Sequence, residues 1–123
     1  LERTGQECDS FGSRYNAYSG LCAHCTWALG WLGDFEKTKT LHEKGLRFAI
    51  DAKSVYGAGL VEVCYGFAMI FKGAGRDACR HLERSVKYFE EAQVRFAAGI
   101  AWGALGYGRY LLGELEAAQA RRF

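Results

Sequence analysis

The sequence predicts an all-α protein built from antiparallel helix pairs that repeat along the chain. Three observations lead to this prediction. First, the 123 residues contain no proline, the strongest helix breaker. Second, no Asn-Gly or Asp-Gly hairpin turn occurs, and no segment sustains the alternation of apolar and polar residues that is typical of a strand. Third, glycines and alanines recur with a period of about 40 residues, which indicates a repeat array.

The repeat is clearest at Gly33, Gly73 and Gly113, which follow one another at a constant offset. The same offset relates Gly66 to Gly106 and Thr38 to Ala78. Further pairs at this offset have the same or a similar side chain: Glu43 and Glu83, Leu46 and Val86, Ala52 and Ala92, Tyr56 and Phe96, Ala58 and Ala98, and Gly59 and Gly99.

Each repeat contains two helical patterns, which we term A and B. The A helices are expected at 14–32, 54–72 and 94–112, and the B helices at 35–52, 76–92 and 115–123. The three repeat glycines fall at the A-to-B turns, where a residue that adopts positive φ is favoured. Asp34 and Asp77 lie near the starts of B helices, where a carboxylate stabilises the exposed N–H groups.

Two glycines, Gly66 and Gly106, lie in the middle of A helices instead, where each costs about 1 kcal/mol relative to alanine. A close approach of a neighbouring helix would offset that cost. Residues 1–13 are similar to 81–93 and are predicted to be the B helix of a preceding repeat. The predicted organisation is therefore 1–13, 14–53, 54–93 and a truncated 94–123, in a chain that starts at Leu1 and is expected to be a piece of a longer protein.

The A and B patterns resemble the tetratricopeptide repeat family, which places Trp, Leu, Gly and Tyr on helix A and Ala on helix B. Trp102, Leu105, Gly106, Gly113 and Ala118 fit that pattern. The resemblance implies a right-handed α-solenoid of about three repeats plus the leading partial repeat, with helices longer than in the standard repeat of about 34 residues. Long repeats of this kind look like the arrays of bacterial signalling proteins such as nucleotide cyclases and ATPase-type transcription regulators.

The resemblance also implies a concave surface formed by the A helices, and here that surface is aromatic and apolar. It predicts a non-catalytic protein-interaction or regulatory module that binds an apolar or amphipathic segment of a protein or peptide, from a partner or from the same polypeptide. Two alternatives stay open: the large side chains are core residues, or the array self-associates as a homodimer through its exposed terminal repeats. The predicted groove residues are Trp27, Trp31, Val63, Phe67, Ile70, Phe71, Tyr107, Tyr110 and Leu111.

Composition excludes several other functions. The formal net charge of +2 comes from interspersed charges, so nucleic-acid binding is not expected. No apolar stretch approaches the roughly 18 to 20 uncharged residues of a membrane span, so no membrane partner is expected either. An odd number of cysteines, five, favours reduced thiols and a cytoplasmic location.

No catalytic site, metal site or cofactor is predicted. Cys22 and Cys25 form a CxxC motif, but both fall in helix-packing positions, and packing is the favoured interpretation over a zinc or redox site. Cys64 and Cys79 are likewise expected to be packing residues. The three histidines, His24, His42 and His81, are scattered in the sequence without acidic or cysteine partners at catalytic spacing.

Overall fold

The computed structural model describes the backbone of residues 17–120 and the side chains of residues 17–113. Within that part of the chain every regular element is a helix, which confirms the all-α prediction. The segment 1–13, predicted as a preceding B helix, lies outside the described residues. The helices are α1 (Ala17–Leu32), α2 (Phe35–Asp51), α3 (Val55–Lys72), α4 (Gly75–Glu91) and α5 (Arg95–Ala120).

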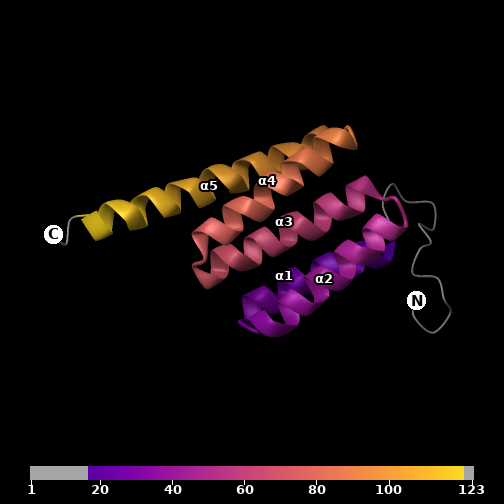
Figure 1. Ribbon diagram of the computed structural model, residues 1–123, viewed down its shortest axis with the longest axis horizontal. Coiled ribbons are helices and arrows are strands. Elements are labelled where there is room, and N and C mark those ends of the chain that lie inside the picture. Colours follow the sequence, from indigo (N-terminus) through magenta and orange to yellow (C-terminus); the bar gives the residue numbers. More distant parts are fainter. Residues whose placement is uncertain (1–16, 121–123) are drawn as a thin grey trace.

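The five helices lie side by side as two hairpins and a fifth, longer helix (Figure 1). The first hairpin pairs α1 with α2, and the second pairs α3 with α4. The central helix, α3, packs against α1, α2 and α4, whereas α5 packs mainly along α4 and touches α3 only slightly.

The turns between helices repeat in their backbone conformation as well as in sequence. Gly33 and Gly73 end α1 and α3 with φ of 81° and 82°, the left-handed conformation that favours glycine. Lys53 and Gln93 follow α2 and α4 with φ of 55° and 59°. The two residues of each pair are one repeat apart, so the positions of the turns follow the predicted spacing up to the start of α5.

Helix starts follow the residues available at each N-cap. The Asp34 carboxylate accepts a hydrogen bond from the Lys37 N–H at 3.3 Å, and the Ser54 hydroxyl accepts one from the Gly57 N–H at 3.1 Å. The N-cap of α4 is Ala74, which offers no side-chain acceptor, but Asp77 places a carboxylate in the first turn. Asp34 and Asp77 thus both lie at helix starts, as predicted.

The predicted turn at Gly113 is wrong, because α5 continues through this glycine to Ala120. The segment 115–120, predicted as the start of a B helix, is the continuation of α5. The first repeat has the N-cap residue Asp34 after its turn glycine, whereas Glu114 at the equivalent place is a good helix former and a poor N-cap. The residues that follow also have high helix propensity, so the helix is not interrupted.

A pair of matched substitutions distinguishes the two kinds of glycine. Gly73→Ala is expected to lower the free energy of unfolding by about 1–2 kcal/mol, because alanine is strained at the left-handed φ. Gly113→Ala is expected to raise it by up to about 1 kcal/mol, because this glycine is helical and no atom lies within 4 Å of the added methyl group. Urea denaturation followed by circular dichroism measures both. Equal destabilisation by the two substitutions would indicate a turn at Gly113.

The core lies on both sides of α3, whose composition reflects that position. By length and composition α3 is apolar enough to cross a membrane. In the fold, 61 % of its residues are buried, and burial against three neighbouring helices accounts for their apolar character. Leu82 and Phe89 of α4 are fully buried over Gly66 and Gly59 of α3, so the close approach predicted at Gly66 is present. The close approach predicted at Gly106 is wrong, because no atom of the described residues lies within 4 Å of a methyl group added there.

Candidate functional site

Four aromatic side chains of α1 and α3 form two pairs of tilted rings on one surface, which we term the aromatic face. The ring centroids of Trp27 and Phe67 are 6.2 Å apart, and those of Trp31 and Phe71 are 4.7 Å apart. Each pair joins residues at equivalent positions in successive repeats. The helices can approach because Gly30 has no side chain: a methyl group there would lie 2.7 Å from the Ala68 Cβ.

The aromatic face is accessible to a partner although its rings pack on one another. Trp31 is 68 % exposed, Trp27 43 % and Phe71 38 %, while Phe67 is half-buried. Exposed large aromatics that gather on one surface are typical of interaction sites, because aromatic side chains contribute much of the binding energy at interfaces.

The other five predicted groove residues lie apart from this face. Val63 is a core residue, 6 % exposed, and does not line an accessible surface. Ile70 and Leu111 are half-buried and line an apolar hollow of about 200 Å³ between the end of α3 and α5. Tyr107 and Tyr110 are exposed on α5, and within residues 17–113 no ring contact joins them to the aromatic face. Because α5 packs mainly on α4, the surface that α1 and α3 share does not extend regularly onto α5.

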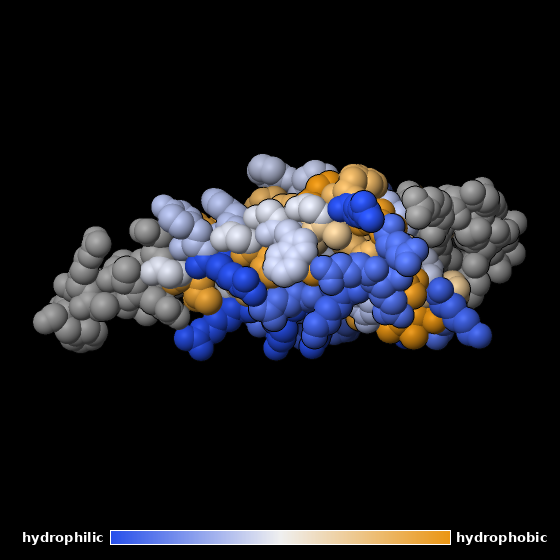
Figure 2. Space-filling view, turned by 90° about the horizontal axis from the view of Figure 1, so that it is seen from above, coloured by the Kyte–Doolittle hydropathy of each residue, from blue (hydrophilic) through white to orange (hydrophobic). Residues whose placement is uncertain are grey.

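The outward side of α5 is a second exposed apolar surface, which we term the α5 outer face. It contains Phe96, Ile100, Tyr107 and Tyr110, each at least 51 % exposed. Gly99 and Gly106 lie between them and have no neighbouring atom within 4 Å of an added methyl group. Viewed from above, a broad band of hydrophilic residues lies beside a paler strip that contains hydrophobic residues (Figure 2). The exposed side chains of α4 are mainly charged, whereas those of α5 up to residue 113 are mainly aromatic.

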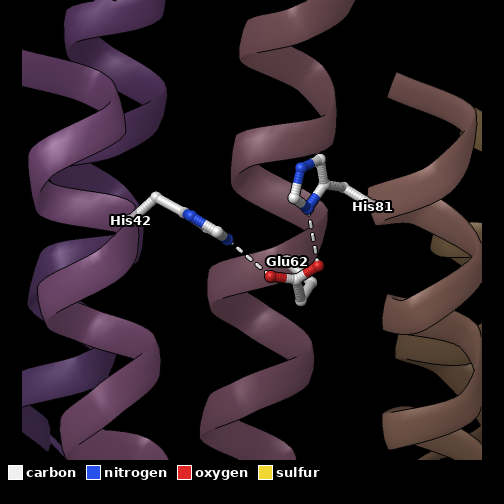
Figure 3. A group of neighbouring side chains, drawn as sticks. All are labelled: His42, Glu62 and His81. Carbon is white, nitrogen blue, oxygen red and sulfur yellow. Dashed lines mark hydrogen bonds and ion pairs between the residues drawn. The ribbon is translucent and has the colours of Figure 1, made fainter. Parts of the chain in front are cut away.

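A buried polar cluster links three helices, and sequence reasoning missed it. Glu62 of α3 is 0 % exposed and lies between His42 of α2 and His81 of α4 (Figure 3). The Nε2 atom of His42 lies 2.5 Å from Oε1 of the carboxylate, and Nδ1 of His81 lies 2.8 Å from Oε2. Each carboxylate oxygen therefore accepts a hydrogen bond from a different ring. The histidines are 7 % and 6 % exposed, so the cluster is enclosed.

An aromatic ring fixes the orientation of both imidazoles. Tyr65 stacks on His42 with centroids 4.1 Å apart and meets His81 edge-on at 4.7 Å. Tyr65 is one helical turn beyond Glu62 on α3, so one helix supplies both the carboxylate and the ring that positions its partners.

The electrostatics of the cluster favour an ionised carboxylate. Burial of Glu62 opposes ionisation and by itself raises the pKa, but the hydrogen bonds and charges of His42 and His81 outweigh it and lower the pKa from 4.5 to about 2. Among the described residues no buried side-chain nitrogen or oxygen lacks a hydrogen-bond partner. The cluster is thus a fully satisfied polar site inside an apolar core.

Two features of the sequence could have indicated this cluster. Glu62 is the single acidic residue in α3, and an isolated carboxylate in an apolar core helix has to be paired. His81 lies one residue before Leu82 and four before Ser85 on the buried side of α4. The histidines are 20 and 19 residues from Glu62, so their proximity depends on helix packing and not on sequence spacing.

The cysteines follow the packing prediction with one exception. Cys22, Cys64 and Cys79 are buried thiols, and burial raises the pKa of Cys64 to about 12. Cys25 is exposed, so its predicted packing role is wrong. Thr26, the next residue, is buried in place of Cys25, and its hydroxyl donates a hydrogen bond to the Cys22 carbonyl at 2.7 Å.

Comparison with protein-family models, curated proteins and solved structures finds no match in any of the three.

Proposed function

We propose that this chain is a non-catalytic protein-interaction module, a right-handed α-solenoid similar to the tetratricopeptide repeat, acting as a regulatory part of a larger signalling protein. Its aromatic face holds the apolar side of an amphipathic helix, from a partner protein or from another segment of the same polypeptide. The observation that carries this proposal is the two accessible pairs of aromatic rings that join α1 to α3.

The spacing of the two ring pairs favours a helical occupant. Trp27 and Trp31 are one turn apart on α1, as Phe67 and Phe71 are on α3, so the face presents two aromatic layers about 6 Å apart. An amphipathic helix offers apolar side chains at the same one-turn spacing and buries them in such surfaces. None of these four side chains carries a charge, so the contacting side of the occupant is apolar too.

The test uses a panel of amphipathic peptides, each long enough for several helical turns with apolar positions at helical spacing, and scrambled peptides of the same composition. We expect at least one ordered sequence to bind, with a blue shift of tryptophan emission as Trp27 and Trp31 are desolvated. Phe71→Ala and Trp31→Ala should each weaken binding about tenfold or more, because central aromatic anchors typically contribute about 2 kcal/mol or more.

Exposed aromatic residues of α5 provide matched controls. Phe96→Ala and Trp102→Ala remove the same side-chain types from exposed positions on α5 and should leave peptide affinity unchanged. Equal loss of affinity in all four variants would contradict the proposal, as would equal binding of ordered and scrambled peptides. Circular dichroism of each variant confirms that it is folded.

A second candidate function, self-association, is favoured by the glycines of α5. Gly59 and Gly66 of α3 are covered by Phe89 and Leu82 of α4, whereas the equivalent Gly99 and Gly106 of α5 are uncovered. The α5 outer face thus repeats a surface that elsewhere in the chain receives a helix. A second copy of the chain would bury it in a homodimer. Light scattering should then show a dimer that Phe96→Ala weakens and Phe71→Ala does not; a monomer at high concentration would contradict self-association.

A further inference from the structure

We propose that His42, Glu62 and His81 form a binding site for a first-row divalent transition-metal ion, with Zn²⁺ the best match. Each residue offers one ligand atom, and the three atoms lie within 4.8 Å of one another. They come from α2, α3 and α4, and Figure 3 shows both imidazoles directed at the carboxylate from opposite sides.

The present distances are close to those that an ion requires. Zinc binds histidine nitrogen at about 2.0–2.1 Å and carboxylate oxygen at about 2.0–2.2 Å, so neighbouring ligand atoms in a tetrahedral site are about 3.3 Å apart. The nitrogen-to-oxygen distances of 2.5 Å and 2.8 Å need to open by less than about 1 Å, and the two ligand atoms that lie farthest apart, within 4.8 Å, need to close by up to about 1.5 Å. Tyr65 packs against both imidazoles, stacked on His42 and edge-on to His81, and so restricts the movement of both rings.

The donor set selects the class of metal. Two imidazoles and one carboxylate suit zinc, cobalt, nickel and copper, whereas calcium and magnesium require more oxygen ligands than the cluster supplies. Binding replaces the N–H groups that now face Glu62, so each ring carries its remaining proton on the other nitrogen. The ionised carboxylate offsets part of the ionic charge, and a water molecule completes a four-coordinate site.

The position of the site implies a structural role for the ion. It would join α2 of the first hairpin to both helices of the second, across the boundary between repeats. All three ligands are at most 7 % exposed, so the ion would exchange slowly. Because the ligands come together only in the folded chain, metal binding would stabilise the folded state.

The test uses the purified, untagged protein stripped with EDTA and then titrated with zinc chloride or cobalt chloride. We expect one ion per chain and a rise in melting temperature of about 5 °C or more at saturating zinc. The cobalt form should absorb in the visible region without a sulfur-to-cobalt charge-transfer band. His42→Gln and His81→Gln should each weaken binding at least about tenfold.

His24→Gln and Cys25→Ser are the controls, since both residues are exposed within the CxxC motif and the substitutions should leave affinity unchanged. Three results would overturn the proposal: no bound ion in the unsubstituted protein, unchanged affinity in the His42 and His81 variants, or a thiolate band in the cobalt spectrum. If a histidine variant does not fold, the stoichiometry and cobalt spectrum of the unsubstituted protein decide the question.

Discussion

Replacing Glu62 with alanine is expected to lower the free energy of unfolding by about 3–5 kcal/mol in metal-free buffer. The carboxylate accepts hydrogen bonds from both histidines and is completely buried. Its removal leaves His42 and His81 enclosed, each without its acceptor, and creates a cavity between three helices. Urea denaturation in the presence of EDTA measures this loss.

Glu83→Ala is the matched control for that substitution. Glu83 also accepts a hydrogen bond from a basic side chain on another helix, Arg109, at 3.3 Å, but both side chains are more than half exposed. Exposed ion pairs contribute at most about 1 kcal/mol. If Glu62→Ala lowers the free energy of unfolding no more than Glu83→Ala does, the carboxylate does not hold the cluster together.

The pH dependence of stability separates loss of charge from loss of volume. The pKa of Glu62 is about 2 in the folded chain and about 4.5 when exposed, so the unfolded state takes up the proton first as pH falls. The stability due to the carboxylate is therefore fully present above pH 4.5 and declines as the pH falls from 4.5 to about 2. The difference in stability between the unsubstituted protein and Glu62→Ala should shrink across that window. A constant difference would show that ionisation is unimportant.

The second large effect is expected at the contact between Leu82 and Gly66. Leu82→Ala should lower the free energy of unfolding by about 2–5 kcal/mol, because Leu82 is 0 % exposed and its removal leaves a cavity. Gly66→Ala should cost about 1–3 kcal/mol, because the new methyl group would lie 2.6 Å from two carbon atoms of Leu82.

The double variant provides the decisive comparison. With Leu82 shortened, the methyl group of Ala at position 66 partly fills the vacated space, so the combined loss should be smaller than the sum of the single losses by at least about 0.5 kcal/mol. Gly106→Ala, at the equivalent position of the next repeat, meets no atom within 4 Å and should instead stabilise α5 by up to about 1 kcal/mol. Additive losses at Leu82 and Gly66 would contradict the observed packing.

Local signals in the sequence were enough to predict much of the fold. The absence of proline, the constant spacing of the repeat glycines and the cap residues placed four helices within a few residues of their observed bounds. These features act through the backbone of a few neighbouring residues. The prediction of a turn at Gly113 is wrong because glycine is compatible with both a left-handed turn and a helix, and the residues after Gly113 favour the helix.

The candidate sites depended on contacts that no local pattern encodes. Trp27 and Phe67 occupy equivalent repeat positions and do meet, but Val63, assigned to the same surface, is in the core. Small rotations of a helix decide which of two adjacent apolar positions is exposed. The sequence gives no reason to pair His42 or His81 with an acidic residue, because no acid stands at catalytic spacing from either histidine. In the folded chain Glu62 lies between them.

The position of Glu62 has a mechanical consequence for the molecule. Arrays of stacked hairpins usually come apart one unit at a time from either end. Here, peeling the first hairpin from the second would break the hydrogen bond between His42 and Glu62 and leave a carboxylate that is buried in the folded chain with only one of its two partners. Tension applied between the ends should therefore strip α5 from α4 first and then rupture the remaining four helices as a single cooperative block.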